Sequence, residues 1–271
     1  MHIQSVIPHV AEGVSLLYSD YPLLIREDFA DFHVRITRPR GIRRWLRPQA
    51  LFMCDTISAF KPLPLAQAFP MLEWGLNWCV SGHAHRYLMI HAAVAEKDGR
   101  AMIMPAPPGS GKSTLCAGLI SRGWRLLSDE MALVRLDDGA IVPHPRPVSL
   151  KNASIDIIKN FAPESIFSAP VTDTIKGTVA HMKPSRESVL RMQESALPAW
   201  VVFPKYEAGA ALQMSAIPPA RAFLRIADNA FNYSILGRAG FEAVACLVDQ
   251  VKCYDFTYSI LDDAIVAFDR L

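Results

Sequence analysis

Residues 102–114 constrain the fold of this chain more than any other stretch. They spell Met-Ile-Met-Pro-Ala-Pro-Pro-Gly-Ser-Gly-Lys-Ser-Thr, an apolar run that enters a turn rich in Pro and Gly. A helical pattern begins directly afterwards. Such a strand, loop and helix hold phosphate groups, because glycines let backbone N–H groups approach the ligand and the helix begins with partial positive charge. The stretch therefore predicts an α/β fold with a phosphate-binding loop for a nucleoside triphosphate.

The residue types in this loop predict separate roles. Gly109 and Gly111 let the backbone curl close to the phosphates, because they carry no Cβ. The Lys112 ammonium would reach the β- and γ-phosphates of ATP, and the Ser113 hydroxyl would lie on the Mg²⁺ side. The strict pattern starts with Gly where this chain has Ala106. The predicted ATP-binding residues of the loop are Pro108, Gly109, Ser110, Gly111, Lys112, Ser113 and Thr114.

Composition narrows the class of protein. The chain has 271 residues, of which 51% are hydrophobic, so it can bury a sizeable core. A formal charge of +2 does not indicate a nucleic-acid or membrane partner. The arginine-rich stretch 38–47 is interpreted as solvated surface, with a patch for nucleic acid or an acidic partner as the alternative. Five scattered cysteines and a start unlike a signal peptide predict reduced thiols in a cytoplasmic protein.

A Pro-rich break at residues 61–64 predicts the domain organisation. We expect a small α+β lobe over residues 1–62 and a catalytic domain over 63–271. Strands are predicted in the lobe at residues 14–18, 33–37 and 51–54. A helix predicted at 66–80 is apolar over most of its circumference, which is typical of a helix packed inside the protein or at a subunit contact in a homo-oligomer. Trp74 and Trp78 are interpreted as core residues.

Two predicted strands bring further polar residues to the loop. A hairpin of strands 87–95 and 101–104 would carry His91 next to the loop-bearing strand. After the loop helix at 112–121, an apolar strand at 124–128 ends in Asp129 and Glu130. Open α/β sheets bind ligands beyond the carboxyl ends of their strands. We therefore expect one carboxylate to hold Mg²⁺ and one to accept the proton of an attacking hydroxyl, with Ser113, Asp129 and Glu130 as the predicted metal ligands.

The C-terminal half supplies candidate cations. The rigid segment 143–147 carries Arg146 and leads to Lys151, and both are predicted to contact the triphosphate. Residues 172–187 are predicted to form a mobile loop whose Lys183 and Arg186 close over the phosphates, with an exposed basic loop as the alternative. The remaining pattern predicts strands at 199–204, 210–215 and 253–259 and helices at 218–230, 241–251 and 262–271.

Three of these elements together resemble one protein family. His91, the loop ending in Gly111-Lys112-Ser113, and residues 121–130 (Ser-Arg-Gly-Trp-Arg-Leu-Leu-Ser-Asp-Glu) are similar to the core of the HPr kinase/phosphorylase family. Residues 145–152 and 177–184 also resemble its bacterial group called HPr kinase-related kinase A. The resemblance covers roughly residues 85 to 271. It implies a P-loop kinase core of the phosphoenolpyruvate-carboxykinase type, a mixed sheet with flanking helices.

The resemblance also implies roles for the site residues. By match, Asp129 would be the catalytic base, His91 would support it, and Lys112 would act on the transferred phosphoryl group. Glu130 stands where the family has a second Asp. The family's Glu-Val-Arg-Gly-Leu-Gly segment has no counterpart here, which leaves open whether HPr is a substrate and whether phosphorolysis occurs.

Two functions fit the sequence. The first is an ATP- and Mg²⁺-dependent kinase that phosphorylates a hydroxyl, either on a Ser or Thr of a protein or peptide or on a small molecule. The second is a switch or assembly module that binds or hydrolyses ATP without kinase activity. The spacing of His91 and of the Asp129–Glu130 pair around the loop favours the kinase, because a switch has no need for these residues.

Overall fold

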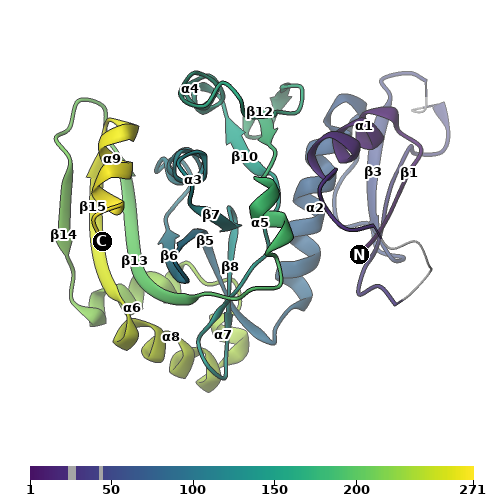
Figure 1. Ribbon diagram of the computed structural model, residues 1–271. Coiled ribbons are helices and arrows are strands. Elements are labelled where there is room, and N and C mark those ends of the chain that lie inside the picture. Colours follow the sequence, from purple (N-terminus) through teal and green to yellow (C-terminus); the bar gives the residue numbers. More distant parts are fainter. Residues whose placement is uncertain (24–28, 43–44) are drawn as a thin grey trace.

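The computed structural model describes residues 1–23, 29–42 and 45–271, and shows a mixed α/β fold built on one large sheet (Figure 1). The sheet has the strand order β14-β15-β13-β6-β5-β8-β9, and β7 also pairs with β5. Strands β6, β13 and β15 run parallel, whereas β5 is antiparallel to its neighbours. Its strands are β5 (Tyr87–Lys97), β6 (Arg100–Pro105), β7 (Arg125–Ser128), β8 (Met131–Arg135), β9 (Ile141–Val142), β13 (Leu197–Tyr206), β14 (Gln213–Ala216) and β15 (Lys252–Tyr258).

Helices cover both faces of the large sheet (Figure 1). On one face α3 (Lys112–Ser121) and α9 (Leu261–Phe268) pack with Trp124 and Phe256. On the other, α6 (Pro219–Asp228), α7 (Tyr233–Leu236) and α8 (Arg238–Gln250) bury residues such as Ile226 and Leu247. Burial of both faces explains why the central strands are continuous apolar runs. In the described part of the chain, no helix has the length and apolar character needed to cross a membrane.

A second sheet, of order β1-β2-β3-β4, lies near the N-terminus. The predicted strands at 33–37 and 51–54 are confirmed, whereas the strand predicted at 14–18 is wrong. Those residues belong to α1, where Val10 and Leu17 are buried at helical spacing and Pro8 starts the first turn. Residues 43 and 44 of the arginine-rich stretch lie outside the described residues. The elements are β1 (His2–Ser5), α1 (Pro8–Leu17), β2 (His33–Thr37), β3 (Gln49–Cys54), β4 (Leu63–Pro64) and the 3₁₀ helix η2 (Leu65–Gln67).

Helix α2 (Ala68–His83) packs against both sheets. Leu72 and Leu76 belong to the core of the N-terminal sheet, whereas Val80 packs with Met89 and Leu133 of the large sheet. The helix ends three residues beyond the predicted position. Helix α2 buries most of its circumference, and its residues join the N-terminal core. That core therefore extends across the predicted boundary at residue 62. The division into domains, and a subunit contact on α2, remain predictions.

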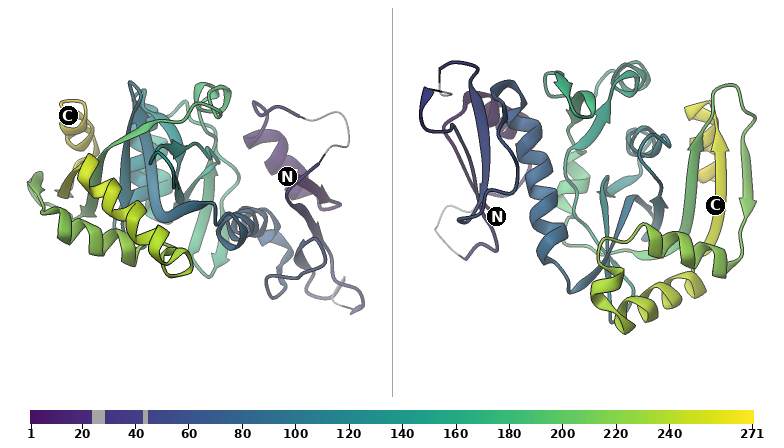
Figure 2. Two further views of the ribbon diagram at one scale, coloured as in Figure 1. Left: turned by 90° about the horizontal axis from the view of Figure 1, so that it is seen from below. Right: turned by 180° about the vertical axis from the view of Figure 1, so that it is seen from behind.

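A small sheet of order β10-β12-β11 lies between α2 and α3 (Figures 1 and 2). The mobile loop predicted at 172–187 is therefore wrong, because β11 and β12 pair in a hairpin that is closed by a 2.6 Å hydrogen bond from Thr174 Oγ1 to the Gly177 carbonyl. The strands are β10 (Val148–Lys151), β11 (Val171–Thr174) and β12 (Gly177–Met182), and the adjoining helices are α4 (Ala153–Phe161) and α5 (Arg186–Leu190).

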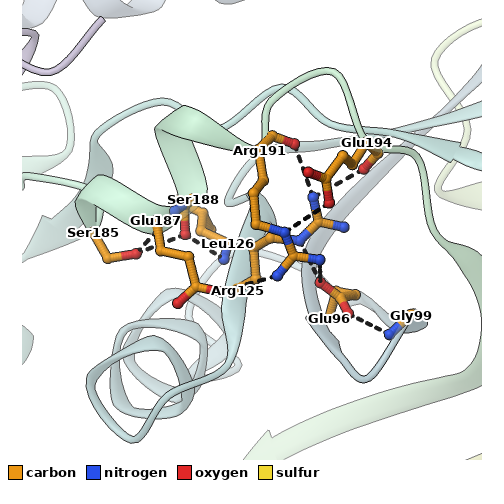
Figure 3. A network of polar contacts seen from close by, with 9 residues as sticks. All are labelled: Glu96, Gly99, Arg125, Leu126, Ser185, Glu187, Ser188, Arg191 and Glu194. Atoms are coloured by element: carbon orange, nitrogen blue, oxygen red, sulfur yellow. Dashed lines mark hydrogen bonds and ion pairs between the residues drawn. The ribbon is translucent and has the colours of Figure 1, made fainter.

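A buried polar network ties α5 and the turn after it to the large sheet (Figure 3). Arg125 of β7 forms an ion pair with Glu96 of β5, and both side chains are almost fully buried. Arg125 Nη1 also donates to the carbonyls of Arg191 and Glu194, each at 2.9 Å. These bonds satisfy a charged pair that would otherwise be costly to bury, and they fix β7 immediately before the predicted acidic residues.

Candidate functional site

The predicted phosphate-binding loop connects β6 to α3. Gly109 and Gly111 both have φ of +87°, a conformation that suits glycine. A Cβ on Gly109 would meet no atom within 4 Å, whereas a Cβ on Gly111 would lie 2.6 Å from Tyr258 Oη. Tyr258 Oη donates to the Gly111 carbonyl at 3.0 Å, which holds the loop against the end of β15. Ala106, in place of the usual Gly, is buried and has no positive φ, so this loop accommodates alanine.

His91 and Lys112 meet beside the loop. Ala92 of β5 pairs with Pro105, the last residue of β6, so His91 lies just beyond the point where the loop starts. Lys112 Nζ is 3.0 Å from His91 Nε2. Burial, followed by the charge of Lys112, lowers the pKa of His91 to about 4, so the imidazole is neutral at pH 7 and Nε2 can accept the lysine N–H. His91 therefore holds the ammonium at the start of α3.

The two acids lie at the break between β7 and β8. Ser128 pairs with Val94 and Met131 pairs with His91, so residues 129–130 lie opposite residues 92–93 of β5. The carboxyl ends of β6 and β7 consequently flank the same part of β5. This edge is where open α/β sheets bind their ligands. The fold thus brings together His91, Lys112, Asp129 and Glu130, as the sequence predicts.

Asp129 is the most strongly perturbed acid of this group. The residue is 5% exposed, and its Oδ2 accepts a 3.0 Å hydrogen bond from the Ser149 amide. Its Oδ1 is buried with no partner among the protein's own atoms. Burial and then the charge of Glu130 raise the pKa of Asp129 to about 6, against the opposing effects of Lys112, the Ser149 amide and Ser113. Such a carboxylate is ionised at pH 7 and still basic enough to take a proton.

Glu130 lies among lysines. Burial acts to raise its pKa, but Lys112 and then Lys176, with smaller effects of His91 and Lys151, outweigh burial and hold the pKa below its ordinary value. Lys151 ends β10, as the sequence predicts, and Lys176 lies in the turn between β11 and β12. Sequence reasoning missed Lys176, although the following Gly177 is a turn signal that separates two short strands. The lysines make this end of the site suitable for phosphate oxygens.

Arg146 occupies a different environment from the one expected for a phosphate clamp. Its guanidinium forms an ion pair with Glu73 of α2 and donates to Asn77 Oδ1 at 2.6 Å and to the Glu73 carbonyl at 2.9 Å. Tyr18 Oη also contacts Arg146 Nε, at 3.4 Å. These contacts join the segment 143–147 to α2. The polar groups of α2 therefore take up the donors that the sequence assigned to ATP.

Lys183 is also placed away from the loop. Its Nζ donates to Ser19 Oγ at 2.6 Å and pairs with Asp20 at 2.7 Å. Lys183 shares a surface pocket with Ser121, the last residue of α3, whereas the phosphate loop precedes the first residue. A helix of ten residues is about 15 Å long, since it rises 1.5 Å per residue. The prediction that Lys183 binds ATP is therefore wrong in this structure, because β12 carries it to the opposite end of α3.

A cavity opens next to the acids, between α2, the segment 143–147 and β12. Its lining includes Asp129, Trp74, His144 and His181. Trp74, interpreted from the sequence as a core residue, instead borders this cavity and lies 5.3 Å below the Lys176 ammonium. Trp78 does pack against the N-terminal core. The sequence gives no local signal for the cavity, because its walls come from three distant segments.

The donor atoms at the site fit Mg²⁺. The Ser113 hydroxyl and the carboxylates of Asp129 and Glu130 are hard oxygen donors, and Mg²⁺ is commonly held by one or two carboxylates together with phosphate oxygens. Within the described ranges there is no cluster of three or more His, Cys, Asp or Glu residues that could hold a metal by themselves. The arrangement therefore suits a metal shared with a nucleotide.

Comparisons with known proteins give two similarities. Residues 71–158, which run from α2 through the loop and both acids into α4, match the family model described as SynChlorMet cassette protein ScmC. Among solved structures, the chain is similar to the HPr(Ser) kinase/phosphatase from Coxiella burnetii, with 11% identity, a TM-score of 0.27, and coverage of 67% of this chain and 95% of that one. No curated protein matches the chain.

Proposed function

We propose that this protein is an ATP-dependent kinase that transfers the γ-phosphoryl group of ATP to a hydroxyl. The observation that carries the proposal is Asp129, a buried carboxylate whose pKa is raised to about 6 and whose Oδ1 has no protein partner. It follows β7 at the same edge of the sheet as the loop and Lys112. The resemblance of these residues to the HPr kinase/phosphorylase family agrees with the proposal.

Each residue has a role in this proposal. The loop 108–114 holds the triphosphate, with Lys112 and Lys151 opposite its negative charge. Ser113 and Glu130 would hold Mg²⁺, which would neutralise charge on the phosphates when bound. Asp129 accepts the proton of the acceptor hydroxyl. The acceptor oxygen then bonds to the γ-phosphorus as the bond to the bridging oxygen of ADP breaks.

His91 acts in this scheme through Lys112. Because the imidazole is neutral and lies 3.0 Å from the ammonium, it orients Lys112 without adding a second positive charge. A protonated histidine at this distance would repel the lysine. The neutral state is therefore the one that supports phosphate binding.

The experiment is an assay of phosphate transfer with γ-labelled ATP. Candidate acceptors are peptides, small hydroxyl compounds and the products of neighbouring genes, since the matching family model describes a cassette protein. Label should appear in an acceptor with the wild type and disappear with Asp129→Asn and Lys112→Ala. Lys183→Ala is a matched control, because it removes a lysine at the other end of α3. Label released only as inorganic phosphate would favour an ATP-hydrolysing switch, and full transfer by Asp129→Asn would refute the assigned base.

A further inference from the structure

The cavity beside Asp129 contains an unusual set of polar atoms. Trp74 Nε1, Ser149 Oγ, His144 Nε2 and both ring nitrogens of His181 are buried without a partner among the protein's own atoms, as is Asp129 Oδ1. All five residues line the same space. Buried polar groups normally have hydrogen-bond partners, so this concentration points to a bound polar group. Neither the phosphate loop nor the proposed roles of the lysines uses these atoms.

The charges around the cavity define what it can accept. Arg146 of the segment 143–147 and Glu73 of α2 neutralise each other in an ion pair, and Glu130 lines the cavity beside Asp129. His181 is 1% exposed, and burial lowers its pKa to about 4 and that of His144 to about 3, so both rings are neutral at pH 7. A neutral imidazole offers one N–H donor and one acceptor nitrogen. The Asp129 carboxylate meanwhile disfavours an anionic group.

The size of the cavity limits the group further. The cavity is partly open, and its inner space of about 20 Å³ has room for one water molecule or one group as small as a hydroxymethyl. Asp129 lies at its boundary with Oδ2 bound to the Ser149 amide, so Oδ1 is the oxygen left to accept a proton. A hydroxyl in this space would thus meet the proposed base and several neutral donors and acceptors together.

We propose that this cavity is the acceptor subsite and that it takes the hydroxymethyl group of a primary alcohol, with His144 and His181 as positioning residues that aim the hydroxyl at Asp129. The inference rests on the proposed kinase function and adds its acceptor chemistry. The hydroxymethyl group can belong to a serine side chain of a peptide or to a small polyol. The remainder of the acceptor stays outside the cavity, because the space has no room for it.

Histidine NMR tests binding without requiring turnover. Protein labelled with ¹⁵N-histidine is loaded with Mg²⁺ and a non-hydrolysable ATP analogue and is titrated with N-acetyl-L-serinamide, glycerol or N-acetyl-L-alaninamide. We expect saturable shifts of the His144 and His181 ring nitrogens with a hydroxyl probe, and none with the alanine compound, which differs from the serine compound only by the hydroxyl. Response to serinamide alone indicates a peptide acceptor, and response to glycerol alone indicates a polyol. Absence of any response to both, or an equal response to the alanine compound, overturns the subsite.

Variants test whether the histidines position the alcohol. His144→Leu should weaken binding of the responding probe about tenfold or more, because a buried hydrogen bond is lost. The shift of the His181 ring nitrogens reports this binding in the variant. His144→Gln should restore most of the affinity, since its amide can replace Nε2. His85→Leu is the matched control, because His85 Nδ1 is also buried without a partner but does not line the cavity. Unchanged probe affinity in His144→Leu, or the same loss in His144→Gln, would show a merely structural role.

The two proposals fail differently. Binding of the ATP analogue to wild-type protein and to His144→Leu is measured separately by calorimetry. We expect the two dissociation constants to agree within about twofold, because no residue of the loop 108–114 lines the cavity. Loss of nucleotide binding in the wild type would refute the kinase. Normal nucleotide binding without any response of His144 or His181 to the alcohols would refute only the acceptor subsite.

Discussion

Asp129→Asn should stabilise the protein at neutral pH while it removes the proposed base. Folding raises the pKa of Asp129 from its ordinary value of 3.8 to about 6. The folded protein therefore binds this proton more tightly than the unfolded chain, and keeping the group ionised costs the folded state free energy. The difference of about 2.2 pKa units, at 1.36 kcal/mol per unit, is a cost of about 3 kcal/mol above pH 6.

The sign of the effect sets its pH dependence. The cost is fully present above pH 6, falls as the pH drops from 6 to 3.8, and is absent below 3.8. Asparagine carries no charge and retains a side-chain oxygen for the Ser149 amide. The free energy of unfolding of Asp129→Asn should consequently exceed that of the wild type by about 3 kcal/mol at pH 8 and by roughly half as much at pH 5.

Urea unfolding followed by circular dichroism at pH 8 and pH 5 measures this difference. Asp138→Asn is the opposite control, because its hydrogen bonds with Arg135 hold the pKa of Asp138 below its ordinary value, so this substitution should lose stability at pH 8. A variant Asp129→Asn that is no more stable than the wild type at pH 8, or whose gain is the same at both pH values, would refute the assignment of a raised pKa to Asp129.

Three further outcomes are expected. The ratio kcat/KM for ATP should be half-maximal near pH 6 and about one-tenth of its plateau at pH 5, because Asp129 must be ionised. A flat profile down to pH 4.5 would contradict the base assignment. In urea unfolding, Arg125→Met should cost about 3–5 kcal/mol, because it removes the buried partner of Glu96 and leaves only the more distant Arg191 at 3.9 Å, whereas Arg191→Met, at a side chain 36% exposed, should cost less than about 1 kcal/mol. Equal losses would argue against the buried ion pair. Calorimetry should find the Kd for Mg²⁺-ATP of Lys183→Ala within about twofold of the wild type, since Lys183 pairs with Asp20. A tenfold weaker affinity would indicate that Lys183 contacts the phosphates after all.

Sequence patterns predicted the nucleotide end of the site because its signals are local. The apolar run before Gly109, the helix after Lys112 and the strand that ends in Asp129 each follow from neighbouring residues. Pairing of two consecutive strands then brings His91 to the same place. Short connections between these elements leave little choice of arrangement.

The surroundings of the cavity, the proposed acceptor subsite, could not be predicted from neighbouring residues. Arg146 meets Glu73 across 73 positions of sequence, and residues 171–182 form two strands, of which β12 pairs with β10 and β11 pairs with β12. Polar composition alone suggested mobility there, whereas pairing with a distant strand stabilises the segment. In α1, Leu17 is buried by packing against other elements, and this tertiary burial outweighs the β preference of Val14.

Helix α2 separates the chain into parts that can change independently. Residues 87–130 supply the phosphate loop, His91 and both acids, whereas Glu73, Trp74 and Asn77 on α2 form one wall of the cavity. A new acceptor could therefore be selected through substitutions on one helix, with the phosphate loop left intact. Such a layout favours the divergence of relatives that share a phosphate donor and differ in what they modify.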